Sequence, residues 1–290
     1  MTRRVGVGVG SIAVVVIVLA SGFVYLRGGS TPIPPDVAVK RFREQAAHAE
    51  GARARAPAKR DTNESRSPTA RAAAKVAVTS SSTPRAKSRP SPPDGVYAYS
   101  TMGHDSVDIL GGSTHTYPDR TTITVRHAGC GLIERWDVLK ERWDERETCP
   151  TLTGDVFKRT TSYHEFFRHA DLRNFTCSGY TYRAGDSPGA SWSVRCVSDA
   201  TTTVTQLHAV AWEYVTVGST RLRTLHVHAH TTITGDQEGD SDRDVWGAAA
   251  DGLVLRERAR VDSDSMQPVF GKTHYHEQYE IRLVSLHPRR

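Results

Sequence analysis

Apolar and polar residues alternate through most of the chain from residue 95 onward. β-branched and aromatic residues are frequent in the alternating runs, and turns containing Gly, Pro or Asp separate them. A period of two predicts strands with one buried face, because successive side chains of a strand point to opposite sides of the sheet. We therefore expect about eight to ten antiparallel strands. The clearest runs are 107–110, 121–125, 132–136, 191–197, 204–217, 221–233, 253–261 and 273–286.

The last three runs are long enough to assign faces. In 221–233, Leu225 and Val227 share one face, and His226 and His228 share the other. The two following runs repeat this separation, with apolar residues opposite rows of Arg, His and Glu. One face apolar and one face charged is typical of an antiparallel sheet that is wet on one side. The fold class we predict is mainly β: a curved antiparallel sheet, forming a half-barrel or open barrel.

One short helix is predicted within this β-rich part. It covers Ser162–His169, where Ser162 is a suitable N-cap and Glu165 completes a capping box. The folded part is expected to be a single domain over residues 95–290, a length within the usual size range of domains.

The chain begins with an apolar segment. Val5–Leu26 contains no charged residue, and a helix of about 20 apolar residues spans the hydrocarbon of a bilayer. Residues 1–26 are therefore predicted to be an N-terminal transmembrane anchor whose partner is the lipid bilayer. A cleaved signal peptide is the alternative, with Ala20–Gly22 as its cleavage site.

Residues 27–94 are rich in Pro, Ala and Arg and contain no long apolar run. Such a segment buries too little apolar surface to fold, so we expect a disordered stalk, with a short helix as an option over residues 36–56. Its 14 Lys and Arg residues either bind anionic lipid headgroups or envelope polymers, or keep the stalk solvated.

The net positive charge of the chain comes from its N-terminal third. Residues 1–94 have 16 Lys and Arg against 6 Asp and Glu, which gives +10, whereas the remainder has 22 against 26, which gives −4. A nucleic-acid-binding domain would concentrate basic residues on its folded part. The balance therefore argues against nucleic acid as a partner.

Four cysteines lie in the predicted domain, and consecutive pairs are separated by 19 positions. Their spacing does not match a structural zinc site, and it suggests disulfides Cys130–Cys149 and Cys177–Cys196, although other connectivities and free thiols stay open. Disulfides persist in oxidising compartments. We expect a single-pass protein of the cell membrane with a cytoplasmic N-terminus and an extracytoplasmic domain.

Two resemblances follow from short motifs. The motifs that carry the first resemblance are residues 94–99, 110–112, 117–118, 121–125, 129–131, 141–144 and 274–279. Through these motifs, most of the predicted domain resembles uncharacterised single-pass membrane-anchored proteins of actinobacteria, a family without known activity. The stretch 246–256 and the long strands after it are similar to the late hairpins of LolA-like half-barrel lipoprotein carriers. That similarity implies a curved sheet that holds acyl chains.

These observations favour a protein without catalytic activity or cofactor, which binds an amphiphile or another envelope component on the apolar face. The expected lining of that face is Val210, Trp212, Leu225, Val227, Leu255, Tyr279 and Ile281. Ligand identity and oligomeric state are left open by the sequence.

A metal-dependent hydrolase is the alternative. Histidines two residues apart on one strand face are a ligand spacing used for zinc and copper. The candidate ligands are His226, His228, His230, His274 and His276. Glu213, Glu257 and Glu277 interrupt apolar faces and would be candidates for acid or base catalysis if they clustered in a cavity.

Overall fold

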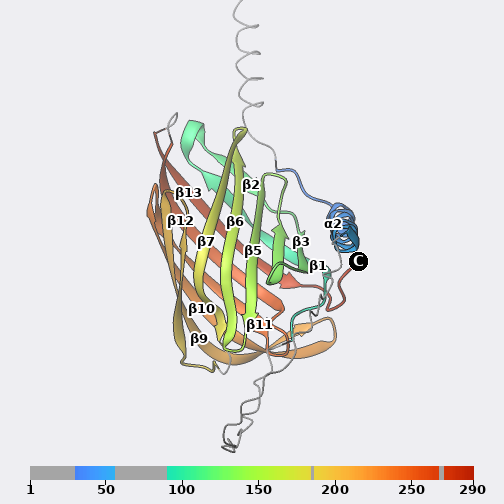
Figure 1. The fold of residues 1–290 in the computed structure, drawn as a ribbon. Helices are drawn as coiled ribbons and strands as arrows, with labels where there is room; N and C mark the ends of the chain where they lie inside the picture. Colours follow the sequence, from blue (N-terminus) through green and yellow to red (C-terminus); the bar gives the residue numbers. More distant parts are fainter. Residues whose placement is uncertain (1–29, 56–89, 184–185, 268–270) are drawn as a thin grey trace, which may run out of the picture.

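The computed structural model describes residues 30–55, 90–183, 186–267 and 271–290 (Figure 1). It contains helix α2 (Pro35–Arg55) and a short 3-10 helix, η1 (Ile109–Gly111). The strands are β1 (Gly95–Val107), β2 (Ser113–Thr116), β3 (Arg120–Ala128), β4 (Gly131–Asp137), β5 (Arg142–Thr151), β6 (Gly154–Phe166), β7 (His169–Arg183), β8 (Ser191–Val197), β9 (Thr201–Val217), β10 (Thr220–Gly235), β11 (Gln237–Ala248), β12 (Val254–Gln267) and β13 (Gly271–Leu283).

The strands form one antiparallel sheet that closes on itself. Neighbouring strands pair in chain order from β3 to β13, β1 pairs with β3, and β2 extends the same edge of β1. The other edge of β1 pairs with β13, from Tyr99 opposite Leu283 to Val107 opposite Tyr275. The prediction of a mainly β antiparallel fold is confirmed, but the half-barrel or open barrel is wrong, because the sheet is closed. A twisted sheet of this size brings its two edges together, and pairing them satisfies their free backbone groups.

The predicted helix over Ser162–His169 is also wrong. Residues 162–166 end β6, residues 169–171 begin β7, and Phe167 and Arg168 form the tight turn between them with positive φ angles of 52° and 62°. The sequence of this segment fits the alternating pattern of a strand as well as it fits a capped helix. Pairing of Phe166 with His169 and of His164 with Asp171 therefore selects the strand.

The segment predicted to be a disordered stalk contains helix α2, which confirms the short helix considered as an option over residues 36–56. Ala38 and Val39 of α2 are buried with Val96 of β1, and Phe42 packs against them. Arg41 forms an ion pair with the buried Asp137 at the end of β4. The expectation of disorder therefore fails for residues 30–55, because a narrow apolar strip and one buried ion pair suffice to hold α2 beside β1 and β3 (Figure 1).

Two predicted segments lie outside the described residues: Val5–Leu26 and the central part of the stalk, residues 56–89. Within the described ranges, none of the helices has the length and apolar character needed to cross a bilayer.

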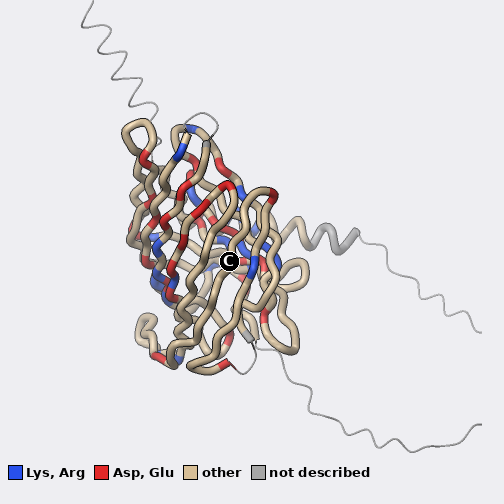
Figure 2. The backbone as a smooth tube through the Cα atoms, turned by 90° about the vertical axis from the view of Figure 1, so that its left-hand side faces the viewer, with Lys and Arg blue, Asp and Glu red and all other residues tan. Residues whose placement is uncertain are grey.

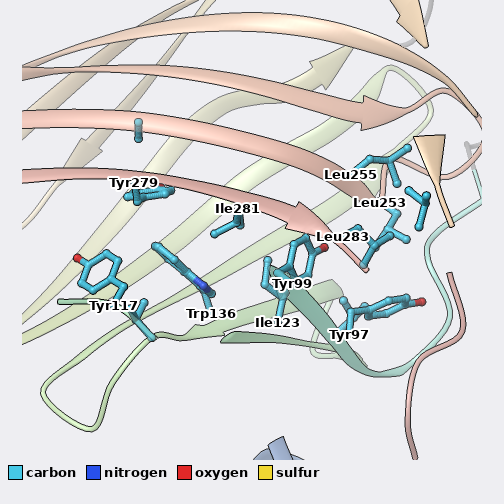
Figure 3. Packing of buried hydrophobic residues seen from close by; sticks show 14 of the residues in the cluster. Tyr97, Tyr99, Tyr117, Ile123, Trp136, Leu253, Leu255, Tyr279, Ile281 and Leu283 are labelled. Atoms are coloured by element: carbon cyan, nitrogen blue, oxygen red, sulfur yellow. The ribbon is translucent and has the colours of Figure 1, made fainter. Parts of the chain in front are cut away.

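The main core fills one part of the barrel interior (Figure 3). Trp136 of β4 lies between Tyr117 and Tyr279, with ring centroids 6.1 and 4.5 Å away. The Tyr99 hydroxyl group donates to the carbonyl oxygen of Val254 at 2.7 Å, so even the polar atom of this buried ring is satisfied. Aromatic and aliphatic side chains of β1, β3, β12 and β13 pack against one another here, so this part of the interior is filled.

Candidate functional site

Strand β13 runs along the barrel wall from one open end of the barrel to the packed core. Its inward side chains are, in order, Thr273, Tyr275, Glu277, Tyr279 and Ile281, and all but Tyr275 are at least nine-tenths buried. Alternate residues of a strand are about 6.7 Å apart. The interior therefore changes along this strand from hydroxyl groups, through a buried carboxylate, to aromatic and aliphatic packing.

A pocket of about 100 Å³ opens at the hydroxyl end of β13, and we call it the mouth pocket. Its lining residues come mainly from the ends of β6, β7, β12 and β13 that lie at the upper end of the barrel in Figure 1. Its lining is apolar in part and polar in part. The lining residues are Val107, Ile109, Ser162, His164, Phe166, His169, Asp171, Arg173, Gln237, Ser265, Thr273 and Tyr275.

Three buried polar atoms of this lining have no hydrogen-bond partner among the described residues. They are the Thr273 hydroxyl oxygen, the Tyr275 hydroxyl oxygen and His164 Nδ1. A buried polar group without a partner is costly and uncommon. Burial, together with the charge of Glu277, raises the pKa of Tyr275 well above its usual value, so this hydroxyl group stays a donor.

A buried carboxylate stands behind His164. Asp105 on β1 has one oxygen 3.0 Å from His115 Nδ1 and the other 3.8 Å from His164 Nδ1. Burial alone would raise the pKa of Asp105, but the hydrogen bond from His115 and the two nearby imidazoles outweigh burial and lower this pKa to about 2. The ring of His115 also stacks on Phe166, at 4.4 Å between centroids. Asp105 thereby fixes part of the pocket wall.

The charged residues of the mouth pocket are already engaged. Asp171 and Arg173 form an ion pair at 2.8 Å, and Arg173 also donates to Gln237 at 2.8 Å and to Thr201 at 3.4 Å. The polar capacity left to the pocket is therefore mainly that of hydroxyl groups and an imidazole.

Buried ion pairs form a layer between the mouth pocket and the core. Arg142 of β5 lies 3.1 Å from Glu277 and 2.7 Å from Asp144, and Tyr117 donates to Glu277. Burial opposes ionisation of both Arg142 and Asp144, but their mutual attraction raises the pKa of Arg142 and lowers that of Asp144. Arg142 and Asp144 are therefore held in their charged states.

The three glutamates considered for acid or base catalysis do not meet. Glu257 lies inside the barrel, where burial favours its neutral form but Arg243 and Arg146 outweigh burial and lower its pKa. Glu213 accepts hydrogen bonds from Trp246 and His226 on the outer side of β10 and β11. Glu257 is thus an ionised structural partner of arginines rather than a poised acid.

The residues predicted to line a binding face are divided between three environments. Leu255, Tyr279 and Ile281 belong to the packed main core. Trp212, Leu225 and Val227 pack in a second cluster with Trp192 and Ala209. Val210 is 41% exposed. The seven side chains do not surround a common cavity.

The predicted metal ligands lie on the outside of the barrel in two groups, which β11 and β12 separate. His228 and His230 of β10 face Asp244 and Asp242 of β11, with closest distances of 3.3 and 2.9 Å.

His274 and His276 of β13 face Asp264 and Asp262 of β12, at 3.0 and 2.7 Å. His226 lies between Glu213 and Asp244, 2.9 Å from each. In every predicted ligand, at least one imidazole nitrogen thus faces a carboxylate of a neighbouring strand. Acidic and basic positions are interspersed over these strands (Figure 2).

Within the described ranges, a single group of three or more potential ligand atoms lies within 4.8 Å of one another: Cys130, Glu147 and Cys149. The structure joins these two cysteines in a disulfide, and it joins Cys177 to Cys196. The predicted disulfide pairing is confirmed, and the histidines do not form a compact ligand set.

Sequence reasoning missed the polar half of the mouth pocket. Tyr275 shares the inner face of β13 with Tyr279, which lies in the core, and nothing in the sequence of this run distinguishes the two positions. The available signal was polar residues at inward positions near strand ends, such as Ser162, His164 and Thr273.

Comparisons with known proteins do not assign the chain to a family. No protein-family model matches the sequence, and no curated protein matches it. A solved structure with detectable similarity is that of the hypothetical lipoprotein YmcC from Escherichia coli (K12), with 11% sequence identity and a TM-score of 0.28. The match covers 61% of this chain and 86% of that one. The resemblances to actinobacterial proteins and to LolA-like carriers stay predictions.

Proposed function

We propose that the protein acts by binding, without catalysis, and that its mouth pocket holds one end of an amphiphile of the cell envelope. The observation that carries this proposal is the mouth pocket itself, where unpartnered hydroxyl groups lie beside apolar side chains. Val107, Ile109 and Phe166 supply the apolar part. Thr273 and Tyr275 supply hydroxyl groups that a ligand would satisfy.

The size of the pocket limits what enters it. Pockets that enclose a drug-sized ligand occupy about 300–1,000 Å³, whereas the mouth pocket has about 100 Å³. The packed core supports the same limit, because its aromatic and aliphatic side chains fill the interior beyond the ion-pair layer. The pocket therefore takes a small end group, and the rest of the ligand extends outward through the opening.

Exposed apolar side chains lie close to this opening. Leu110 follows the lining residue Ile109 and is 50% exposed, and Met266 follows Ser265 and is 71% exposed. An alkyl chain leaving the pocket would contact apolar surface there. This arrangement favours an amphiphile over a purely polar small molecule.

Two disulfides support an extracytoplasmic location. Together with the predicted anchor over residues 5–26, they are the basis for proposing a membrane-tethered protein of the envelope. The bilayer as partner, the envelope polymers bound by the stalk and the absence of nucleic-acid binding are parts of the same proposal.

Native mass spectrometry of the full chain tests the binding function. The protein is purified from membranes into an amphipathic polymer, without detergent, and co-purified small molecules are measured. Ser162→Leu fills the pocket from β6, and Thr161→Leu places the same side chain on the outer face of that strand. We expect an amphiphile on the wild type and on Thr161→Leu, and at least about tenfold lower occupancy on Ser162→Leu. Equal occupancy of all three, or none on any, contradicts the proposal.

A further inference from the structure

We infer that the mouth pocket selects an uncharged oxygen group, such as an ester carbonyl or a hydroxyl, and rejects carboxylate, phosphate and ammonium ends. This inference rests on the proposed binding function and specifies the chemistry of its ligand.

The ionisable lining residues come from three strands: His164 from β6, His169, Asp171 and Arg173 from β7, and Tyr275 from β13. Arg173 is the strongest candidate to receive an anion. However, its guanidinium group is held by Asp171, Gln237 and Thr201. An anionic ligand would have to displace Asp171, and a cationic ligand would have to displace Arg173 from the same pair.

Burial makes that exchange unfavourable. A carboxylate or ammonium group removed from water without its own counter-charge loses far more solvation free energy than a neutral carbonyl group does. Asp105, directly behind His164, is ionised and adds repulsion for a second anion. Its two oxygen atoms already face the imidazoles of His115 and His164, which leaves less for a cationic ligand to gain.

The free groups match a neutral oxygen acceptor. The hydroxyl groups of Thr273 and Tyr275 lie on the same face of β13, two residues apart, and neither has a protein partner among the described residues. Both can donate, and an ester offers two oxygen atoms that accept. Binding would thus satisfy groups that are otherwise buried without partners.

A matched series of six-carbon amphiphiles tests this inference: methyl hexanoate, hexan-1-ol, hexanoate and hexylamine. Each is titrated calorimetrically at pH 7 into the full chain, held in an amphipathic polymer. We expect methyl hexanoate and hexan-1-ol to bind at least about tenfold more tightly than hexanoate and hexylamine. Tighter binding of either charged compound overturns the inference while leaving the binding function intact. If none of the four compounds binds saturably, the inference and the proposed binding function are both contradicted.

Hydroxyl-deletion variants locate the effect. Thr273→Val and Tyr275→Phe each remove one donor with little change of shape, and each is expected to weaken methyl hexanoate binding roughly three- to tenfold. Thr122→Val is the control, because the Thr122 hydroxyl oxygen is also buried without a partner but does not line the mouth pocket. Unchanged affinity in both pocket variants, or an equal loss in Thr122→Val, contradicts the assignment.

Discussion

Asp105 Oδ1 lies 3.0 Å from His115 Nδ1, and both side chains are fully buried. The pair joins β1 to β2, and the imidazole stacks on Phe166, a lining residue of the mouth pocket. The carboxylate therefore links the pairing of β1 with β2 to the wall of the mouth pocket. Its effect on stability depends on pH, because the folded state holds it in the ionised form.

Asp105→Asn is expected to flatten the acid side of the stability profile. The folded-state pKa of Asp105, about 2, is below its ordinary value of 3.8. The stabilisation is therefore complete above about pH 4 and is lost as the pH falls toward 2. We expect the wild type to lose on the order of 2 kcal/mol of unfolding free energy over that interval through this group. Asp105→Asn should lack this loss and be less stable at pH 7. Urea unfolding at several pH values measures it.

Asp240→Asn is the control for that experiment, since Asp240 is exposed on β11. Its acid profile should match the wild type. A wild-type profile that Asp105→Asn reproduces unchanged would show that the buried pair does not govern acid stability.

The ion-pair layer is expected to be sensitive to the loss of one partner. Glu277→Gln leaves Arg142 buried with Asp144 as its remaining carboxylate. Breaking a buried pair in this way typically costs about 3–5 kcal/mol. The double variant Arg142→Met/Glu277→Leu removes both charges and should recover part of that loss. Urea unfolding compares the two, with Glu238→Gln on the exposed face of β11 as control. A single variant as stable as this control contradicts the account of the layer.

The ion pair between Arg41 and Asp137 is predicted to contribute to the docking of helix α2. Arg41→Ala removes the partner of Asp137, whose side chain is fully buried, and leaves it to Arg135. We expect a loss of about 1–3 kcal/mol. The neighbouring Lys40 is 78% exposed and pairs with Glu44 at 3.9 Å, so Lys40→Ala should change stability by less than about 0.5 kcal/mol. Chemical denaturation distinguishes the two, and equal effects would remove the special role of Arg41.

The two disulfides predict a redox-sensitive stability. Each closes a loop between positions 19 apart, and a loop of this length contributes about 3 kcal/mol in the chain-entropy model. Cys177→Ser/Cys196→Ser should therefore lower the unfolding free energy by about that amount. Alkylation followed by intact-mass measurement should label no cysteine of the unreduced wild type. Labelling of all four under those conditions would contradict the pairing and the oxidising location.

The sequence predicted local features better than their assembly. Alternation placed Leu225 inside and His226 outside, because that pattern depends on the strand alone. Closure of the barrel depends on pairing Tyr99 with Leu283, which lie far apart in the chain, and no local pattern encodes it. The acidic residues Asp242 and Asp244 lie in β11, where they face the histidines of β10.

The mouth pocket could not be located from the sequence for a related reason. Thr273 and Tyr279 both point inward from β13, but their surroundings are set by the ends of β6, β7 and β12. Only the three-dimensional register decides which inward residue meets the opening and which meets the core.

Photocrosslinking tests the central claim most directly. Methyl hexanoate carrying a diazirine next to its ester group is irradiated with the full chain, and the modified residues are mapped by mass spectrometry. The account predicts labels on the inner ends of β6, β7 and β13, at residues 162–173 and 273–275, and their loss in Ser162→Leu. Labels confined to the outer strand faces, or unchanged in Ser162→Leu, would contradict it.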